Sequence, residues 1–197
     1  MLVIGLTGGV ASGKTTISNL FSRLGVPVVD TDIVSRELLE KGQPGYIKVI
    51  QKLGRDILLE DGNIDRRKLR QAVFSEPALK TWLEKMLHPL IYQSAQQQLE
   101  KQTDSKYSIL VVPLLFETNF DSLVDRTLVV DCSRDTQFKR LVERDNIDDA
   151  LAIKMLDQQW SNDQRLSKAN DIIHNDRDEN LVLQVKNLHE HYLTIST

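Results

Sequence analysis

Cysteine is nearly absent from the sequence. Cys132 is the one cysteine among 197 residues, so no internal disulfide can form and nothing in the fold requires an oxidising compartment. Long hydrophobic runs are absent as well, since no stretch approaches the ~18 apolar residues of a membrane span. The first residues carry no basic segment, and their apolar run is soon broken by glycine, which is not typical of a signal peptide. These absences predict a cytoplasmic protein without a membrane partner.

Positive charge is also scarce, because 25 Lys and Arg against 28 Asp and Glu give a formal net charge of −3. A nucleic-acid partner normally requires a clustered positive excess, so we expect none, and we expect any bound phosphate to be held locally. Proline and glycine, at 5 and 9 residues, are too few for a disordered or fibrous chain. The length suits one α/β domain with insertions, and it leaves open whether the protein is a monomer or a small homo-oligomer.

Short apolar runs indicate five strands, over residues 2–6, 27–30, 107–112, 126–131 and 171–173. Helical periodicity begins at Lys14 and stops at Gly25, and it returns over residues 136–143, 148–160 and from 181 onward. Residues 33–102 also favour helices, with predicted interruptions at residues 42–45 and 61–63, at Pro77 and at Pro89. Strands that alternate with helices predict a doubly wound parallel sheet, into which the long helical stretch is inserted.

Residues 8–15, GGVASGKT, match the phosphate-binding pattern G-x-x-x-x-G-K-[ST] between a predicted strand and a predicted helix. In such a loop the backbone N–H groups and the positive helix end face an anion. Lys14 is expected to reach the outer phosphates, and the Thr15 hydroxyl to bind Mg²⁺. A chance match is the alternative, and the strand–loop–helix placement disfavours it. The nucleotide-binding residues predicted here are Gly9, Ala11, Ser12, Gly13, Lys14, Thr15 and Thr16.

A phosphate loop alone does not separate kinases from nucleotide switches or motors. Asp30 and Asp32 lie at the C-terminal end of the second predicted strand, where a parallel sheet places its ligand crevice, and either carboxylate is a candidate base for a hydroxyl acceptor. Helix capping is the alternative role for Asp30. The guanine-reading pattern Asn-Lys-x-Asp is absent, and a strand-terminal Asp typical of motors is replaced by the segment 113–117, PLLFE. These features favour a small-molecule kinase.

Three arginines after the fourth predicted strand, Arg140, Arg144 and Arg165, are candidates for a mobile lid over the transferred phosphoryl group. Such a lid excludes water, which otherwise hydrolyses ATP. Solvated helix arginines are the alternative, and a packing or capping role is the alternative for His88.

The sequence resembles the dephospho-CoA kinases along nearly its whole length. The resemblance is carried by residues 4–9 with 13–15, Asp30-x-Asp32 followed by Arg36, residues 62–66, Leu69, Phe74, His88-Pro89, residues 113–117, Arg140, Gln159, Arg165 and Asn175. It implies ATP-dependent phosphorylation of the ribose 3′-hydroxyl of dephospho-CoA, with Mg²⁺. Asp32 is then the catalytic base beside Lys14 and Arg140, while Arg36, His88 and Leu114 lie near the acceptor and Asn175 lies near ATP.

The fold implied is a three-layer P-loop NTPase domain over residues 1–197. Its core comprises about residues 1–45, 106–142 and 171–197, with an acceptor-binding helical insertion at about 46–105 and a helical lid at about 143–170. Two residues depart from the family pattern, because Asn162 stands where a basic residue is common and Asn170 where Asp is common. Another nucleoside or nucleotide kinase of the same fold and a nucleotide-dependent switch are the alternative functions.

Overall fold

The computed structural model describes residues 1–176 and 180–196. The chain divides into two compact units, of which unit 1 comprises Met1–Asp30 with Leu99–Thr197 and unit 2 comprises Thr31–Gln98. Within the described ranges, no helix combines the length and the apolar character needed to cross a membrane.

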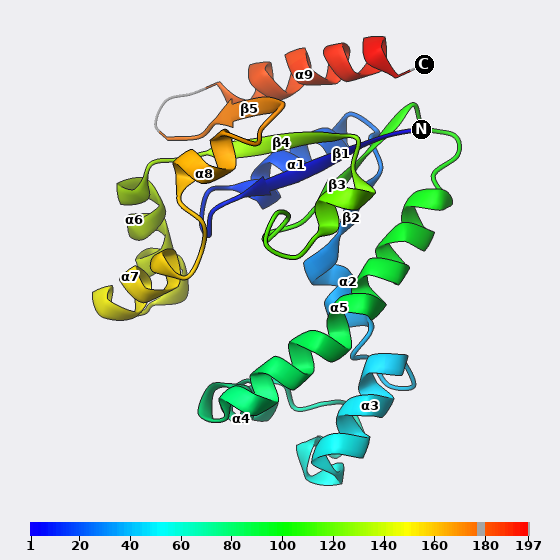
Figure 1. Cartoon of the computed structure of the whole chain (residues 1–197), viewed down its shortest axis with the longest axis vertical. Helices are drawn as coiled ribbons and strands as arrows, with labels where there is room; N and C mark the ends of the chain where they lie inside the picture. The colour runs from blue at the N-terminus through cyan, green and yellow to red at the C-terminus, as the bar shows by residue number, and fades with distance from the viewer. Residues whose placement is uncertain (177–179, 197) are drawn as a thin grey trace. The chain divides into compact units, whose positions relative to one another are not determined.

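Unit 1 contains a five-stranded sheet in the order β2-β3-β1-β4-β5, in which every pairing is parallel (Figure 1). The central strand β1 pairs on both sides, with Leu6 opposite Val111 of β3 and Leu128 of β4. The predicted strands and the α/β class are therefore confirmed. The strands are β1 (Leu2–Gly8), β2 (Val28–Asp30), β3 (Tyr107–Val111), β4 (Arg126–Asp131) and β5 (Asp171–His174).

Helices α1 and α9 pack against this sheet through apolar side chains. The main core joins Ile17 and Phe21 of α1 and Tyr192 of α9 to buried residues of β1, β3, β4 and β5. The predicted helix over 148–160 ends early, at Asp157, and Ser161 starts a separate helix through a capping box with Gln164. The helices are α1 (Lys14–Arg23), the 3₁₀ turn η2 (Phe120–Leu123), α6 (Arg134–Asp145), α7 (Asp149–Asp157), α8 (Asn162–Leu166) and α9 (Leu181–Ile195).

Unit 2 is helical, as the sequence predicts. The interruption expected at residues 42–45 is confirmed at Gly42, which has a φ of 87°, whereas α3 already begins at Pro44. Residues 61–63 form a turn closed by the Leu59 N–H bond to the Asn63 carbonyl. Its elements are α2 (Thr31–Glu37), α3 (Pro44–Leu53), the 3₁₀ turn η1 (Arg55–Ile57), α4 (Arg66–Ser75) and α5 (Pro77–Glu100), which runs past the unit boundary.

The predicted break at Pro89 is wrong, because α5 continues through it. Proline inside a helix loses one backbone hydrogen bond and costs about 3 kcal/mol. Burial on either side offsets this cost: Met86 and Leu87 before Pro89 and Ala95 after it are buried. Pro77, in contrast, does mark a boundary, since it is the first residue of α5, where a missing N–H costs little.

Candidate active site

The phosphate loop connects the end of β1 to the start of α1. Gly13 precedes the helix with a φ of 100°, in the left-handed region that favours glycine. A Cβ at this position would lie 2.1 Å from Asn175 Nδ2, so the position has no room for a side chain. Since glycine cannot cap the helix with a side chain, the first N–H groups of α1 remain available to an anion.

Lys14 is the first residue of α1 and reaches back over the loop. Its Nζ donates to the carbonyl oxygens of Gly8 at 2.8 Å and Gly9 at 3.0 Å. The ammonium group therefore lies against the loop backbone, where a phosphate oxygen can replace the carbonyl contacts. Thr15 and Thr16 follow in the first turn of α1 and are both exposed.

Asn175, directly after β5, joins the far edge of the sheet to this loop. Its Nδ2 donates to the Ser12 carbonyl oxygen at 2.7 Å, and its backbone N–H donates to the Asp131 carbonyl oxygen. Arg140 of α6 secures the same turn, because its guanidinium donates to the carbonyl oxygens of Asn175 at 3.0 Å and Asp176 at 2.9 Å. The structure thus brings Arg140, Asn175 and the phosphate loop together within unit 1.

Two glutamines also contact the loop. Gln137 of α6 donates its Nε2 to the Cys132 carbonyl oxygen at 2.6 Å, and its Oε1 lies 2.5 Å from where a Cβ of Gly9 would be. Gln159, which follows α7, accepts the Val10 backbone N–H at 2.8 Å. Sequence reasoning missed Gln137 altogether and included Gln159 only within the family resemblance. Only the glycine at position 9 signals that a side chain from elsewhere packs closely there.

Arg165 of α8 is buried, with 3% of its surface exposed, and it donates to Gln159 Oε1 at 3.3 Å. Burial lowers the pKa of this guanidinium, while the negative charge of Glu117 opposes that shift. Arg165 also lines a cavity of about 360 Å³ together with Gln137, Gln159, Trp160 and Asn162. The predicted lid arginine is therefore packed beside the phosphate loop in this structure.

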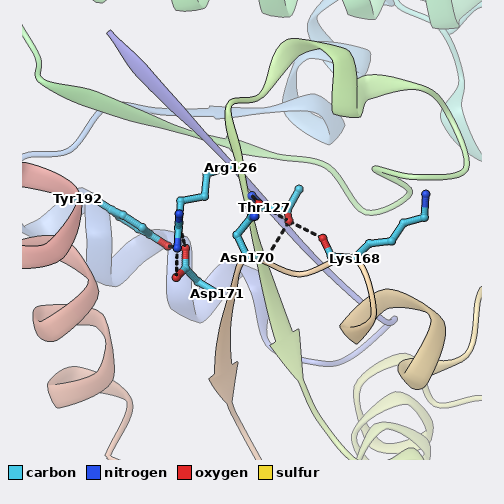
Figure 2. Close-up of polar contacts among 6 residues, drawn as sticks. All are labelled: Arg126, Thr127, Lys168, Asn170, Asp171 and Tyr192. Atoms are coloured by element: carbon cyan, nitrogen blue, oxygen red, sulfur yellow. Dashed lines mark hydrogen bonds and ion pairs between the residues drawn. The ribbon is translucent and has the colours of Figure 1, made fainter. Parts of the chain in front are cut away.

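The two departures from the family pattern have structural explanations. Asn170 Oδ1 accepts the backbone N–H of Thr127 at 2.8 Å, so the amide provides the acceptor oxygen that an aspartate would provide (Figure 2). The Thr127 hydroxyl donates to the Lys168 carbonyl oxygen at 2.8 Å and fixes the segment after α8 to the start of β4. Asn162 Nδ2 donates to the Asp131 carboxylate, whose other oxygen lies 2.8 Å from His174 Nδ1.

Next to these contacts, Arg126 and Asp171 join the first residues of β4 and β5 through a two-point ion pair (Figure 2). The Tyr192 hydroxyl of α9 donates to the same carboxylate at 3.0 Å. The Asp171 hydrogen bond raises the pKa of Arg126, and burial, with Asp171 nearby, raises that of Tyr192. This cluster fixes β5, and through it the turn that carries Asn175.

The predicted acceptor residues belong mostly to unit 2. Asp32 lies in the first turn of α2 and Arg36 in its last turn, while His88 lies within α5. Because α2 begins at Thr31, directly after β2, strand alternation does not relate Asp30 to Asp32. Asp30 ends β2 in unit 1, and Leu114, also in unit 1, is 37% exposed.

A parallel sheet in this order, with a Walker-type loop between its central strand and a helix, defines the P-loop kinase class. The family model for dephospho-CoA kinase matches residues 2–180. The chain belongs to the dephospho-CoA kinase family.

A curated relative agrees with this assignment, and solved structures share the fold. A dephospho-CoA kinase of Vibrio parahaemolyticus is 49% identical, with 98% of this chain and 96% of the relative covered. Among solved structures, a Thermus thermophilus protein matches with a TM-score of 0.80 over 100% of this chain and 98% of its own. The dephospho-CoA kinase of Campylobacter jejuni matches with a TM-score of 0.73 over 96% of both chains. Both structures are 23% identical to this chain and support the fold.

Proposed function

We propose that this protein transfers the terminal phosphoryl group of ATP to the ribose 3′-hydroxyl of dephospho-CoA. The products are coenzyme A and ADP, and the reaction is the last step of coenzyme A biosynthesis. The observation that supports it most directly is the phosphate loop itself, with Lys14 over its backbone, in a chain that matches the dephospho-CoA kinase model over residues 2–180.

The residues of unit 1 bind and orient ATP. The loop N–H groups and the start of α1 hold phosphate oxygens, and Lys14 neutralises charge on the outer phosphates. Asn175 holds the loop through the Ser12 carbonyl oxygen, and Arg140 holds the turn that carries Asn175. Because these donors are in place before the reaction, little reorganisation is needed as charge develops.

Mg²⁺ is the metal we propose for this site. Thr15 presents an exposed hydroxyl in the first turn of α1, next to the place where the loop receives phosphates, and oxygen is the ligand that Mg²⁺ prefers. When bound, the ion neutralises phosphate charge. We also place the reaction in the cytoplasm, where an ATP-dependent biosynthetic step has its substrates.

Residues of unit 2 act on the acceptor in this proposal. Asp32 orients the 3′-hydroxyl and takes its proton as the bond to phosphorus forms. Arg36 and His88 bind the acceptor, and Leu114 of unit 1 contributes an apolar contact. Arg36 carries a positive charge suited to the diphosphate of dephospho-CoA.

Mass spectrometry of dephospho-CoA incubated with the protein, ATP and Mg²⁺ tests the reaction. We expect a mass gain of one phosphoryl group, lost with EDTA and restored by Mg²⁺, and no gain in parallel incubations with adenosine, AMP or shikimate. Lys14→Ala, which removes a half-buried side chain over the loop and leaves the core intact, should abolish the gain. A faster reaction with one of the other acceptors would refute the substrate assignment.

A further inference from the structure

The phosphate loop is held at Val10 by residues that lie outside the motif. The Val10 N–H donates to Gln159 Oε1 at 2.8 Å, across a separation of 149 residues. The next residue, Ala11, has a φ of 57°, a left-handed conformation that costs free energy for any residue with a Cβ. The bond from Gln159 therefore fixes the backbone immediately before the most strained residue of the loop.

The oxygen of Gln159 has its orientation determined by two donors. Besides the Val10 N–H, it accepts a bond from the Arg165 guanidinium at 3.3 Å. A carboxamide oxygen has two lone pairs, and both are used here. The opposite orientation of the amide would place its NH₂ group against two other donors, so the arrangement has one stable form.

The side chains around Val10 strengthen this attachment. Leu141 of α6 and Ala152 and Leu156 of α7 form a buried cluster, against which Val10 and Ala11 pack. Val10 is thus held by its side chain in an apolar cluster and by its N–H on Gln159. All of these groups belong to unit 1.

We propose that Gln159 is a positioning residue that holds the Val10–Ala11 peptide in the conformation that receives the nucleotide phosphates. Gln159 does not contact the reacting atoms in this role. It acts through the loop backbone, and Arg165 acts through Gln159 by fixing its oxygen. The inference rests on the proposed function in that the loop is taken to bind the phosphates of ATP.

Gln159→Leu removes the acceptor oxygen at nearly constant side-chain volume. Gln159→Asn shortens the side chain by one methylene, which moves the oxygen away from Val10, but the amide remains a polar partner for Arg165. Gln159→Glu keeps an acceptor, and Arg165 offsets its charge. The matched control is Gln158→Leu, because Gln158 is the exposed neighbour. The measurements are hydrogen exchange of the Val10 amide by NMR without ligand, calorimetric Kd for MgATP, and Tm.

We expect faster exchange of the Val10 amide and about a 10-fold higher Kd for MgATP in the Leu and Asn variants, the effect of one hydrogen bond. The Glu and Gln158→Leu variants should remain within about 3-fold of the wild-type Kd. A purely structural role would lower Tm and leave the Kd of the folded protein unchanged. That result, or unchanged Val10 exchange in a folded Leu or Asn variant, would overturn the proposal.

Failure of the proposed function would be visible separately. In that case the wild-type protein would produce no coenzyme A, whereas the exchange of the Val10 amide and the Kd for MgATP would still decide the role of Gln159.

Discussion

At the scale of single residues, neutral side chains hold most of the phosphate loop. Gln137, Gln159 and Asn175 reach it from three separate segments and contact it through carboxamide groups. A carboxamide donates and accepts without adding net charge, so these contacts fix the loop without charge, and in our proposal Lys14 and the helix end supply the positive charge for the phosphates. In this proposal, the residues that fix the position of the loop backbone differ from those that supply its positive charge.

Asp32→Asn tests the catalytic base. We expect kcat to fall by about 10²–10⁴-fold, the usual contribution of positioned proton transfer, with little change in binding of either substrate. Asp30→Asn is the matched control, since Asp30 ends β2 and belongs to the other unit. Steady-state kinetics with calorimetric binding measure both effects. A larger loss of kcat in the Asp30 variant, or a change in KM alone in the Asp32 variant, would show that Asp32 is not the catalytic base.

Cys132 should be unreactive in the folded protein. It is fully buried, and burial raises the pKa of its thiol to about 11. At pH 8 only ~0.1% of it is then thiolate, the nucleophilic form. We expect no iodoacetamide adduct by intact mass under native conditions and one adduct in guanidinium chloride. Rapid native alkylation would show that the end of β4 opens.

At the scale of the elements, the phosphate loop tolerates no side chain at Gly13. Gly13→Ala combines an unfavourable φ of 100° with a Cβ 2.1 Å from Asn175 Nδ2. Since Asn175 would have to release the Ser12 carbonyl, we expect MgATP affinity to fall at least about 10-fold, as when a hydrogen bond and a close fit are lost together. The measurement is calorimetric Kd.

Gly25→Ala is the control for this substitution. Gly25 also has a positive φ, 81°, but no atom lies within 4 Å of the added Cβ. It should lose about 1–2 kcal/mol of stability from backbone strain alone and keep its affinity for MgATP. Equal loss of affinity in both variants would mean that strain, and not the contact with Asn175, is responsible.

The sequence predicted β1, β3 and β4 well because each is an apolar run buried along nearly its whole length, a signal that is local in the chain. Pro89 was misread, since burial of Leu87 and Ala95 overrides a local helix-breaking preference. The carboxamide contacts were beyond sequence reasoning for another reason. Asn175 meets Ser12 across 163 residues, and no local pattern encodes which distant amide will reach a loop.

At the scale of the whole molecule, the candidate residues are divided between two compact units. The phosphate loop, Arg140 and Asn175 belong to unit 1, whereas Asp32, Arg36 and His88 belong to unit 2. We therefore expect each substrate to protect mainly one unit in hydrogen exchange. MgATP alone should slow exchange in residues 8–16, and dephospho-CoA alone in α2 and α5.

Residues 148–169 should exchange more slowly when both ligands are present, if they close as a lid over the nucleotide. Mass spectrometry of peptides with each ligand singly and together measures all these effects. This division of roles would be contradicted if both ligands protected the same unit. It would also be contradicted if the hydrogen exchange of residues 148–169 were unchanged with both ligands bound.

The place of β1 in the sheet has a consequence for synthesis on the ribosome. β1 ends at Gly8, yet its neighbours are β3, which begins at Tyr107, and β4, which begins at Arg126. Unit 2 is one continuous stretch, Thr31–Gln98, and its contacts are short in sequence, so it is complete before either neighbour of β1 has been made. We expect the helical unit to form first during translation, while the apolar strand that leads into the phosphate loop waits, exposed, for its partners.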